Sequence, residues 1–317
     1  MGQAPTKIAN ALIHAVAREE FSRNLLYSFL QYSVFPFLFV VVYGLVYLGV
    51  AYGFSLYFTA FFVSPLALAY IYLLECYMPY KRDWNLSQHD LPSDLTGFLV
   101  YVAVLEPLEK ALIPLAGAAL AATVVKSGIT PHAIELLNTG NLFVDVVFIA
   151  IVVEFFRYWF HRLYHSVPFL WRVHIMHHIP KRLHMLNNFR VSPFEQFSVL
   201  MAGMVPAAML GATEEAFIYY GLLHMILGLF NHANIDNRYG ILNYVFATNE
   251  LHRWHHTTDS AIGEKNFMFV LSLWDIIFGT FYFPKNKSTP DSVGLFKEVN
   301  YPLTGYFTQT LAPFRRS

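Results

Sequence analysis

The uncharged sequence NLLYSFLQYSVFPFLFVVVYGLVYLGVAYGFSLYFTAFFVSPLALAYIYLL occupies residues 24–74, between Arg23 and Glu75. At about 1.5 Å of rise per residue, an apolar helix needs roughly 20 residues to cross the hydrocarbon core of a bilayer. This run of 51 residues is therefore long enough for two crossings, with a turn at residues 51–53. We predict a helical membrane protein that starts with a membrane-spanning hairpin.

The composition of the chain indicates the same class. Of its 317 residues, 56% are hydrophobic and only 13% are charged, whereas soluble domains carry about 25% charged residues. The formal net charge is zero, which gives no support for a nucleic-acid partner. Because Cys76 is the only cysteine, an internal disulfide and a cysteine-ligated zinc or iron–sulfur site are excluded. Any metal must be held by His, Asp or Glu.

Further apolar regions extend the predicted membrane part. Residues 95–125 are interrupted by charged residues near Glu106 and form either one broken crossing or a crossing plus an interfacial segment. Residues 142–160 form another crossing. Two shorter stretches, 197–213 and 216–230, are predicted to form a re-entrant hairpin. The predicted fold class is all-α, with about four crossings, this hairpin and a cytosolic helical cap.

Basic residues predict the orientation. They occur in the N-terminal segment, at Lys81 and Arg82, and in number after Phe160. The positive-inside rule places these regions in the cytoplasm and residues 51–53 and 127–140 outside. We therefore predict an integral, multi-pass membrane protein whose active site lies on the cytoplasmic side. The membrane would be the inner membrane of a bacterium or the endoplasmic reticulum of a eukaryote.

Eight of the 14 histidines fall in three short windows with the spacings H-x3-H, H-x2-H-H and H-x2-H-H. Residues three or four apart share one face of a helix, so each window directs its imidazoles one way. Imidazole is a good ligand for iron, zinc, copper or nickel, and eight can supply two metal ions with about four nitrogens each. The eight predicted ligands are His161 and His165, then His174, His177 and His178, and finally His252, His255 and His256.

Single residues near these windows could complete the site. His232 follows the apolar stretch 216–230 and is either a ninth ligand or a hydrogen-bond donor beside the ligands. His184 is a ligand, a hydrogen-bonding neighbour of a ligand, or merely polar. Glu154 lies two helical turns before His161, where it could accept the outer ring N–H of a ligating histidine. Four more carboxylates are candidates for that role, Glu195, Glu250, Asp259 and Asp275.

These motifs resemble the fatty acid hydroxylase and sterol desaturase superfamily, particularly its bacterial-type sterol desaturase proteins and their alkylglycerol monooxygenase relatives. The likeness covers about residues 140–290, and the three histidine motifs together make it specific. The segments that carry it are EFFRYWFHRLYH (154–165), HIMHH (174–178), LHRWHH (251–256) and LWDIIFGTFYFP (273–284).

The resemblance implies a di-iron centre held by the eight motif histidines and by His232. It also implies O₂-dependent hydroxylation or desaturation of a sterol, fatty acyl or ether lipid. Because the chain has no G-x-G-x-x-G dinucleotide loop, electrons are expected from a separate reductase, ferredoxin or cytochrome b5-like donor. The implied division is an N-terminal cytosolic or interfacial segment, a transmembrane region, a catalytic domain and a C-terminal tail, at residues 1–28, 29–140, 141–290 and 291–317.

The chain departs from the superfamily pattern at three places. It has Glu154 where members often have Asp, and Ser192-Pro193 where many have His-Pro. It has His184 where many have Asn, so His184 could replace the missing histidine as a ligand.

Two other functions fit a histidine-rich membrane site. A zinc hydrolase would activate water at the same residues, but the H-E-x-x-H signature is absent and no carboxylate lies inside a motif. A non-enzymatic metal transporter would hold its site near the bilayer midplane, whereas charge and hydropathy place these motifs at one surface. The oxygenase is therefore the preferred prediction.

Overall fold

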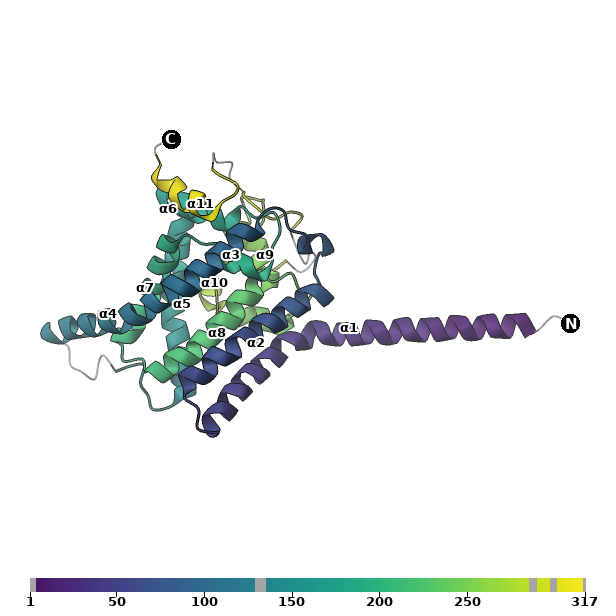
Figure 1. The fold of residues 1–317 in the computed structure, drawn as a ribbon, viewed down its shortest axis with the longest axis horizontal. Helices are drawn as coiled ribbons and strands as arrows, with labels where there is room; N and C mark the ends of the chain where they lie inside the picture. The colour runs from purple at the N-terminus through teal and green to yellow at the C-terminus, as the bar shows by residue number, and fades with distance from the viewer. Residues whose placement is uncertain (1–3, 129–134, 285–289, 297–300, 316–317) are drawn as a thin grey trace.

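The computed structural model describes residues 4–128, 135–284, 290–296 and 301–315, and this part of the chain is helical with no β-strand. The predicted all-α class is confirmed for these residues. Most helices pack into one body, from which the first part of α1 extends away (Figure 1). The longer helices are α1 (Ala4–Ala51), α2 (Leu56–Tyr77), α3 (Leu91–Val100), α4 (Glu106–Lys126), α5 (Leu142–Ser166), α6 (Pro168–His178), α7 (Pro193–Met209) and α8 (Glu214–His232). The short ones are α9 (Asn249–His255), α10 (Leu273–Ile277) and α11 (Tyr306–Leu311).

In the part of the chain that the structure describes, three helical segments are long and apolar enough to cross a membrane, which supports a membrane-associated protein. The first two, Asn24–Ala51 and Leu56–Tyr77, agree with the predicted hairpin. Gly53 lies between them with φ +88°, a conformation that glycine adopts without a Cβ clash. The third is Leu91–Lys126, a continuous helical path through α3, a π-helical turn at Tyr101–Leu105 and α4. The interrupted region 95–125 is thus one long helix.

The predicted crossing at residues 142–160 and the predicted hairpin at residues 197–230 agree less well with the structure. Helix α5 has 25 residues, but it carries Asp145, Glu154 and Arg157, so it lacks the apolar window of the other three segments. Helices α7 and α8 do not mainly pair as a hairpin, because α7 packs on α4 and α5 while α8 packs on α2 and α5. Part of the predicted outer loop, residues 129–134, lies outside the described residues.

Two apolar clusters hold the helices of the body together, and one of them includes α5. Val153 of α5 packs with Ala207 of α7 and Tyr220 of α8 in one of them. Gly203 of α7 permits the close approach of α7 to α5, because a Cβ there would lie 2.9 Å from the Val153 carbonyl oxygen. The larger cluster joins α1, α2 and α8, where the Phe35 and Phe230 rings meet edge to face at 5.2 Å. The first of these clusters fixes α5, the helix that carries the first histidine motif.

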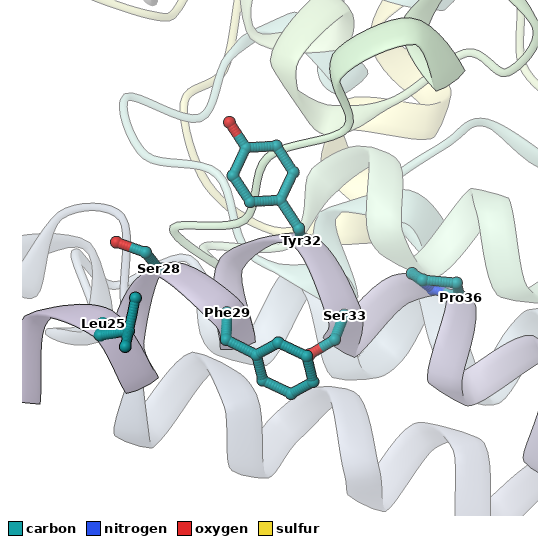
Figure 2. A pocket seen from close by; sticks show the side chains of 6 residues that line it. All are labelled: Leu25, Ser28, Phe29, Tyr32, Ser33 and Pro36. Atoms are coloured by element: carbon teal, nitrogen blue, oxygen red, sulfur yellow. The ribbon is translucent and has the colours of Figure 1, made fainter. Parts of the chain in front are cut away.

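Helix α1 changes direction where it meets the body (Figure 1). It contains Pro36, which has no N–H to donate and weakens the helix around it. Before this point, the Tyr27 hydroxyl and the Gln31 amide both donate to an Asp236 carboxylate oxygen, at 2.9 and 2.8 Å. A shallow apolar groove lies on this part of α1 (Figure 2), lined by Leu25, Ser28, Phe29, Tyr32, Ser33 and Pro36.

Candidate metal centre

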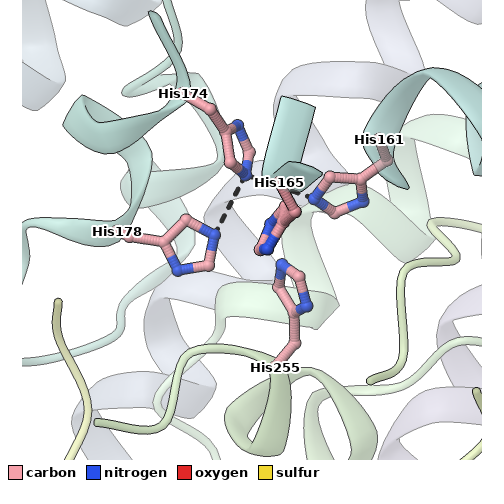
Figure 3. A group of neighbouring side chains, drawn as sticks. All are labelled: His161, His165, His174, His178 and His255. Carbon is pink, nitrogen blue, oxygen red and sulfur yellow. Dashed lines mark hydrogen bonds between the residues drawn. The ribbon is translucent and has the colours of Figure 1, made fainter. Parts of the chain in front are cut away.

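The structure brings the nine predicted histidines together in two groups, and within each group the potential ligand atoms lie within 4.8 Å of one another. Figure 3 shows the rings of the first group turned toward a common centre. The five-histidine group is His161, His165, His174, His178 and His255. The four-histidine group is His177, His232, His252 and His256.

A sharp corner between α5 and α6 brings the first two motifs together. Helix α5 ends at Ser166 and α6 begins at Pro168, because the residue before a proline is pushed out of the helical conformation. Proline itself is well tolerated at the first position of a helix. With only Val167 between the helices, the His165 and His174 rings lie 4.9 Å apart.

The last four histidines come from the ends of two other helices. His232 is the final residue of α8, and α9 carries His252 and His255. His256 follows directly as the residue that caps α9. The two groups share a boundary, since the His178 and His256 rings stack with centroids 4.4 Å apart. The centre is therefore built where four helix ends meet.

Proton positions at His161 and His174 favour a cation between them. His161 Nδ1–H donates to the Phe267 carbonyl at 2.6 Å, and His174 Nδ1 lies 2.6 Å from a Glu195 carboxylate oxygen. A neutral imidazole with its proton on Nδ1 presents a lone pair at Nε2. The two Nε2 atoms are only 3.2 Å apart, so two lone pairs face each other. A metal ion between them would turn this repulsion into ligation.

Distances in the four-histidine group fit the same interpretation. The Nε2 atoms of His177 and His232 are 3.2 Å apart, and those of His232 and His252 are 3.0 Å apart. His256 Nε2 is 3.0 Å from His252 Nε2. Two nitrogens held at about 2.1 Å from one ion, at right angles to each other, are about 3.0 Å apart. The donor atoms are thus spaced like the edges of a coordination polyhedron.

Burial keeps these rings in the form that binds metals. It lowers the pKa of His177, His178, His252 and His256 well below the usual histidine value, and neighbouring imidazoles lower it further. At neutral pH these side chains are uncharged, and neutral imidazole is the ligating form. The residues and their spacing therefore fit a pair of metal ions.

Three of the predicted carboxylates, Glu195, Glu154 and Asp275, lie in different places. Glu195 contacts the His174 ring, as described above. Glu154 is fully buried but does not take its predicted place beside a histidine ring. It accepts hydrogen bonds from the backbone N–H groups of Phe269 and Val270, at 3.2 and 2.8 Å. Asp275 likewise accepts from backbone N–H groups, in the segment that leads to Phe269.

His184 lies outside both histidine groups, so the structure does not support it as a ligand of this centre. Its Nε2 lies 2.9 Å from an Asp94 carboxylate oxygen, in a separate buried cluster with Asp90. Arg182 pairs with Asp90 at 2.6 Å, and Arg190 lies 3.3 Å from Asp94. Burial tends to raise the pKa of Asp90, but Arg182 outweighs it and lowers the pKa to about 2. The arginines already balance these carboxylates.

Comparison with known proteins gives a consistent picture. The family model for fatty acid hydroxylases matches residues 146–280. The chain is 31% identical over 267 residues to ornithine lipid hydroxylase OlsE of Rhizobium tropici, covering 82% of this chain and 76% of that protein. The chain belongs to the fatty acid hydroxylase family. It is also 30% identical to human alkylglycerol monooxygenase over 130 residues, 41% of this chain and 28% of that enzyme. No solved structure matches significantly.

The fatty acid hydroxylase match contains all nine histidines but not the C-terminal residues that cover them. Gly294 N–H donates to the His256 carbonyl at 2.9 Å. The Phe296 ring stacks on His165 at 5.8 Å and lies 4.9 Å from Trp171. Residues 294–296, at the start of the predicted C-terminal tail, therefore form part of the wall of the centre.

Several residues that hold this centre escaped the sequence prediction. The carbonyl groups of Phe267 and Lys265 accept hydrogen bonds from His161 and His255, at 2.6 and 2.9 Å. A backbone carbonyl is present in every residue, so no sequence signal marks it. Glu75, at the end of α2, accepts from the backbone N–H of Asn234, close after His232. Of these residues, only Glu75 carries a signal in the sequence, because it is an acidic residue at the end of a long apolar run.

Proposed function

We propose that the protein is a membrane-bound di-iron oxygenase that uses O₂ and external electrons to hydroxylate or desaturate a lipid. The main support is the convergence of nine imidazoles in two adjoining groups. Imidazole suits iron, and the relatives include a lipid hydroxylase and monooxygenases. The nine histidines are the proposed ligands, five at one position and four at the other.

A pair of iron ions held there would supply the redox chemistry for oxidising an unactivated C–H bond. In hydroxylation, one oxygen atom of O₂ enters the C–H bond and the other leaves as water, with two electrons and two protons from outside. In desaturation, both oxygen atoms leave as water, which takes up two hydrogens from the lipid together with two electrons and two protons from outside. The chain's own residues orient the ligand rings, as Glu195 does for His174, and their burial excludes water.

The proposed substrate is a membrane lipid, and ornithine lipid is the first to test because of the relative at 31% identity. Three apolar helical segments support a multi-pass protein that meets its substrate in the bilayer. Basic residues near the motifs support a site on the cytoplasmic side. The electrons are proposed to come from a separate reductase, ferredoxin or cytochrome b5-like protein, since the chain has no dinucleotide-binding loop.

The decisive experiment measures metal, oxygen and lipid together. The full chain is purified in detergent, loaded with iron, and supplied with a reducing system and ornithine lipid. We expect about two iron ions per chain, O₂ consumption, and a product that has gained one oxygen atom or lost two hydrogens. The His252→Ala variant should give none of this turnover. One equivalent of zinc with O₂-independent cleavage of the lipid would overturn the proposal in favour of a hydrolase.

A further inference from the structure

The segment 265–270 provides the hydrogen-bond acceptors for two ligands of the five-histidine group. His161 Nδ1–H donates to the Phe267 carbonyl at 2.6 Å, and His255 Nδ1–H donates to the Lys265 carbonyl at 2.9 Å. Carbonyl oxygens only accept, so both rings are fixed with the proton outward and the Nε2 lone pair inward. The orientation of these two ligands thus depends on how firmly the segment is held.

Asp275 holds the first half of this segment. Its carboxylate accepts from the backbone N–H groups of Phe267 and Met268, at 3.0 and 2.9 Å. The Thr280 hydroxyl donates to the same carboxylate at 2.6 Å. Burial raises the pKa of Asp275 to about 6, although these hydrogen bonds oppose the shift. The carboxylate is therefore ionised at neutral pH and binds the N–H groups as charge-assisted acceptors.

Glu154 holds the second half. It accepts from the backbone N–H groups of Phe269 and Val270, at 3.2 and 2.8 Å, and from the Tyr220 hydroxyl at 3.1 Å. The Arg157 guanidinium lies 3.5 Å from the Glu154 carboxylate and 4.5 Å from the centre of the Phe269 ring. Four successive N–H groups, 267 to 270, are therefore bound by two buried carboxylates, one from α10 and one from α5.

We propose that Glu154 and Asp275 are positioning residues that pre-organise the five-histidine metal position through the backbone of residues 265–270. In the described residues, no hydrogen bond joins this segment to a ring of the four-histidine group. The segment is linked to the neighbourhood of that group by Asn231, which precedes His232 in the chain. The side-chain amide of Asn231 donates to the Phe269 carbonyl at 2.7 Å. Loss of either carboxylate should therefore weaken one metal position far more than the other.

The inference rests on the proposed function only in requiring that the histidines bind metal, so the test measures binding rather than turnover. The full chain in detergent is stripped with a chelator and titrated with Co²⁺, whose visible absorption reports the number of ligands. We expect two Co²⁺ per wild-type chain. In Asp275→Asn and in Glu154→Gln, one Co²⁺ should bind at least about tenfold more weakly, with loss of its absorption bands, while the other is little changed.

Asp145→Asn provides a matched control. Asp145 is also a buried carboxylate of α5, and it accepts from the Thr139 backbone N–H at 2.8 Å and the Thr139 hydroxyl at 2.7 Å. It sits at the opposite end of α5 from the histidines. Its replacement should lower thermal stability but leave both Co²⁺ affinities at the wild-type level.

A milder variant covers the case in which Asp275→Asn does not fold. Thr280→Val removes one hydrogen bond to Asp275 and keeps the carboxylate, so it should weaken the same Co²⁺ by a smaller factor. Folded variants of Asp275 and Glu154 that bind both Co²⁺ with wild-type affinity and spectrum would overturn the inference. Wild-type protein that binds a single Co²⁺ would instead overturn the di-metal proposal, and the inference would then be judged by whether Asp275→Asn weakens that ion.

Discussion

His177 and His178 are neighbours in the chain, yet their imidazoles belong to different histidine groups. Successive residues of an α-helix point about 100° apart, so the two side chains leave the helix in different directions, and their ring centroids lie 5.6 Å apart with the ring planes nearly perpendicular. His255 and His256 repeat the arrangement with rings at 90°. Each histidine pair therefore places one ligand in each group, which ties the two positions into one rigid unit.

This division predicts different metal losses for two adjacent substitutions. His177→Ala leaves three histidines in its group, and His178→Ala leaves four in the other. Both variants should lose lipid turnover, because each disturbs the pair. His177→Ala should fall to about one metal ion per chain, whereas His178→Ala should retain more metal, because imidazole affinity depends on the number of ligands. Metal analysis of the purified variants measures the difference.

The control for these variants is His89→Asn. His89 is exposed and has φ +66°, a left-handed conformation that asparagine tolerates better than alanine. This variant should keep both metal ions and full turnover. Full activity in both His177→Ala and His178→Ala would show that these residues are not ligands.

The contact between Glu195 and His174 predicts a graded loss of metal affinity. Glu195→Ala removes the acceptor 2.6 Å from His174 Nδ1 and should weaken metal binding by roughly 10–100-fold. Glu195→Gln keeps an acceptor oxygen and should lose less. A chelator-competition titration of the two variants measures this order, and equal losses in both would contradict the hydrogen-bonding role.

The grouping of the histidines could be predicted because a helix fixes the direction of side chains spaced by three or four residues before any tertiary contact forms. The same periodicity misled the prediction for Glu154. It shares a helical face with His161 but lies seven residues away, about 10.5 Å along the axis, too far to touch that ring. Its partners are backbone N–H groups from residues 269 and 270, whose approach to α5 depends on tertiary packing.

The prediction and the structure also differ at His184 and in α5, and both differences have local causes. His184 follows the end of α6 and has an extended backbone, φ −151° and ψ 161°, so helical spacing from His178 says nothing about its direction. The predicted crossing at residues 142–160 rests on hydropathy alone. Asp145 and Glu154 are buried and hydrogen-bonded within the protein, a form of compensation that hydropathy does not register.

The burial of the histidines predicts that the metal-free protein is acid-sensitive. Burial lowers the pKa of rings such as His177 and His256 in the folded state, while unfolded histidines titrate near about 6.5. Below that pH the unfolded state binds more protons, so the free energy of unfolding falls as the pH falls. Thermal melts of chelator-stripped protein in detergent between about pH 8 and pH 5 should show this slope.

Removal of one buried histidine should make the fall in thermal stability with decreasing pH shallower. His256→Gln lowers the number of protons taken up on unfolding by one, because the pKa of His256 is lowered by burial in the folded state. Melting temperatures that stay flat down to about pH 5 in the wild-type protein would contradict neutral buried histidines.

The close approach of α5 and α7 predicts opposite effects for two glycine substitutions in helices. In Gly203→Ala, the new Cβ would lie 2.8 Å from a Val153 methyl carbon and 2.9 Å from the Val153 carbonyl oxygen. The backbone must shift, which should cost about 1–3 kcal/mol of stability. It should also weaken metal binding, because α5 carries His161 and α7 carries Glu195. In Gly221→Ala, no atom lies within 4 Å of the new Cβ, so the better helix propensity should stabilise by up to about 1 kcal/mol. Thermal melts of both variants measure the contrast, and equal behaviour would show that α7 does not seat against α5 through Gly203.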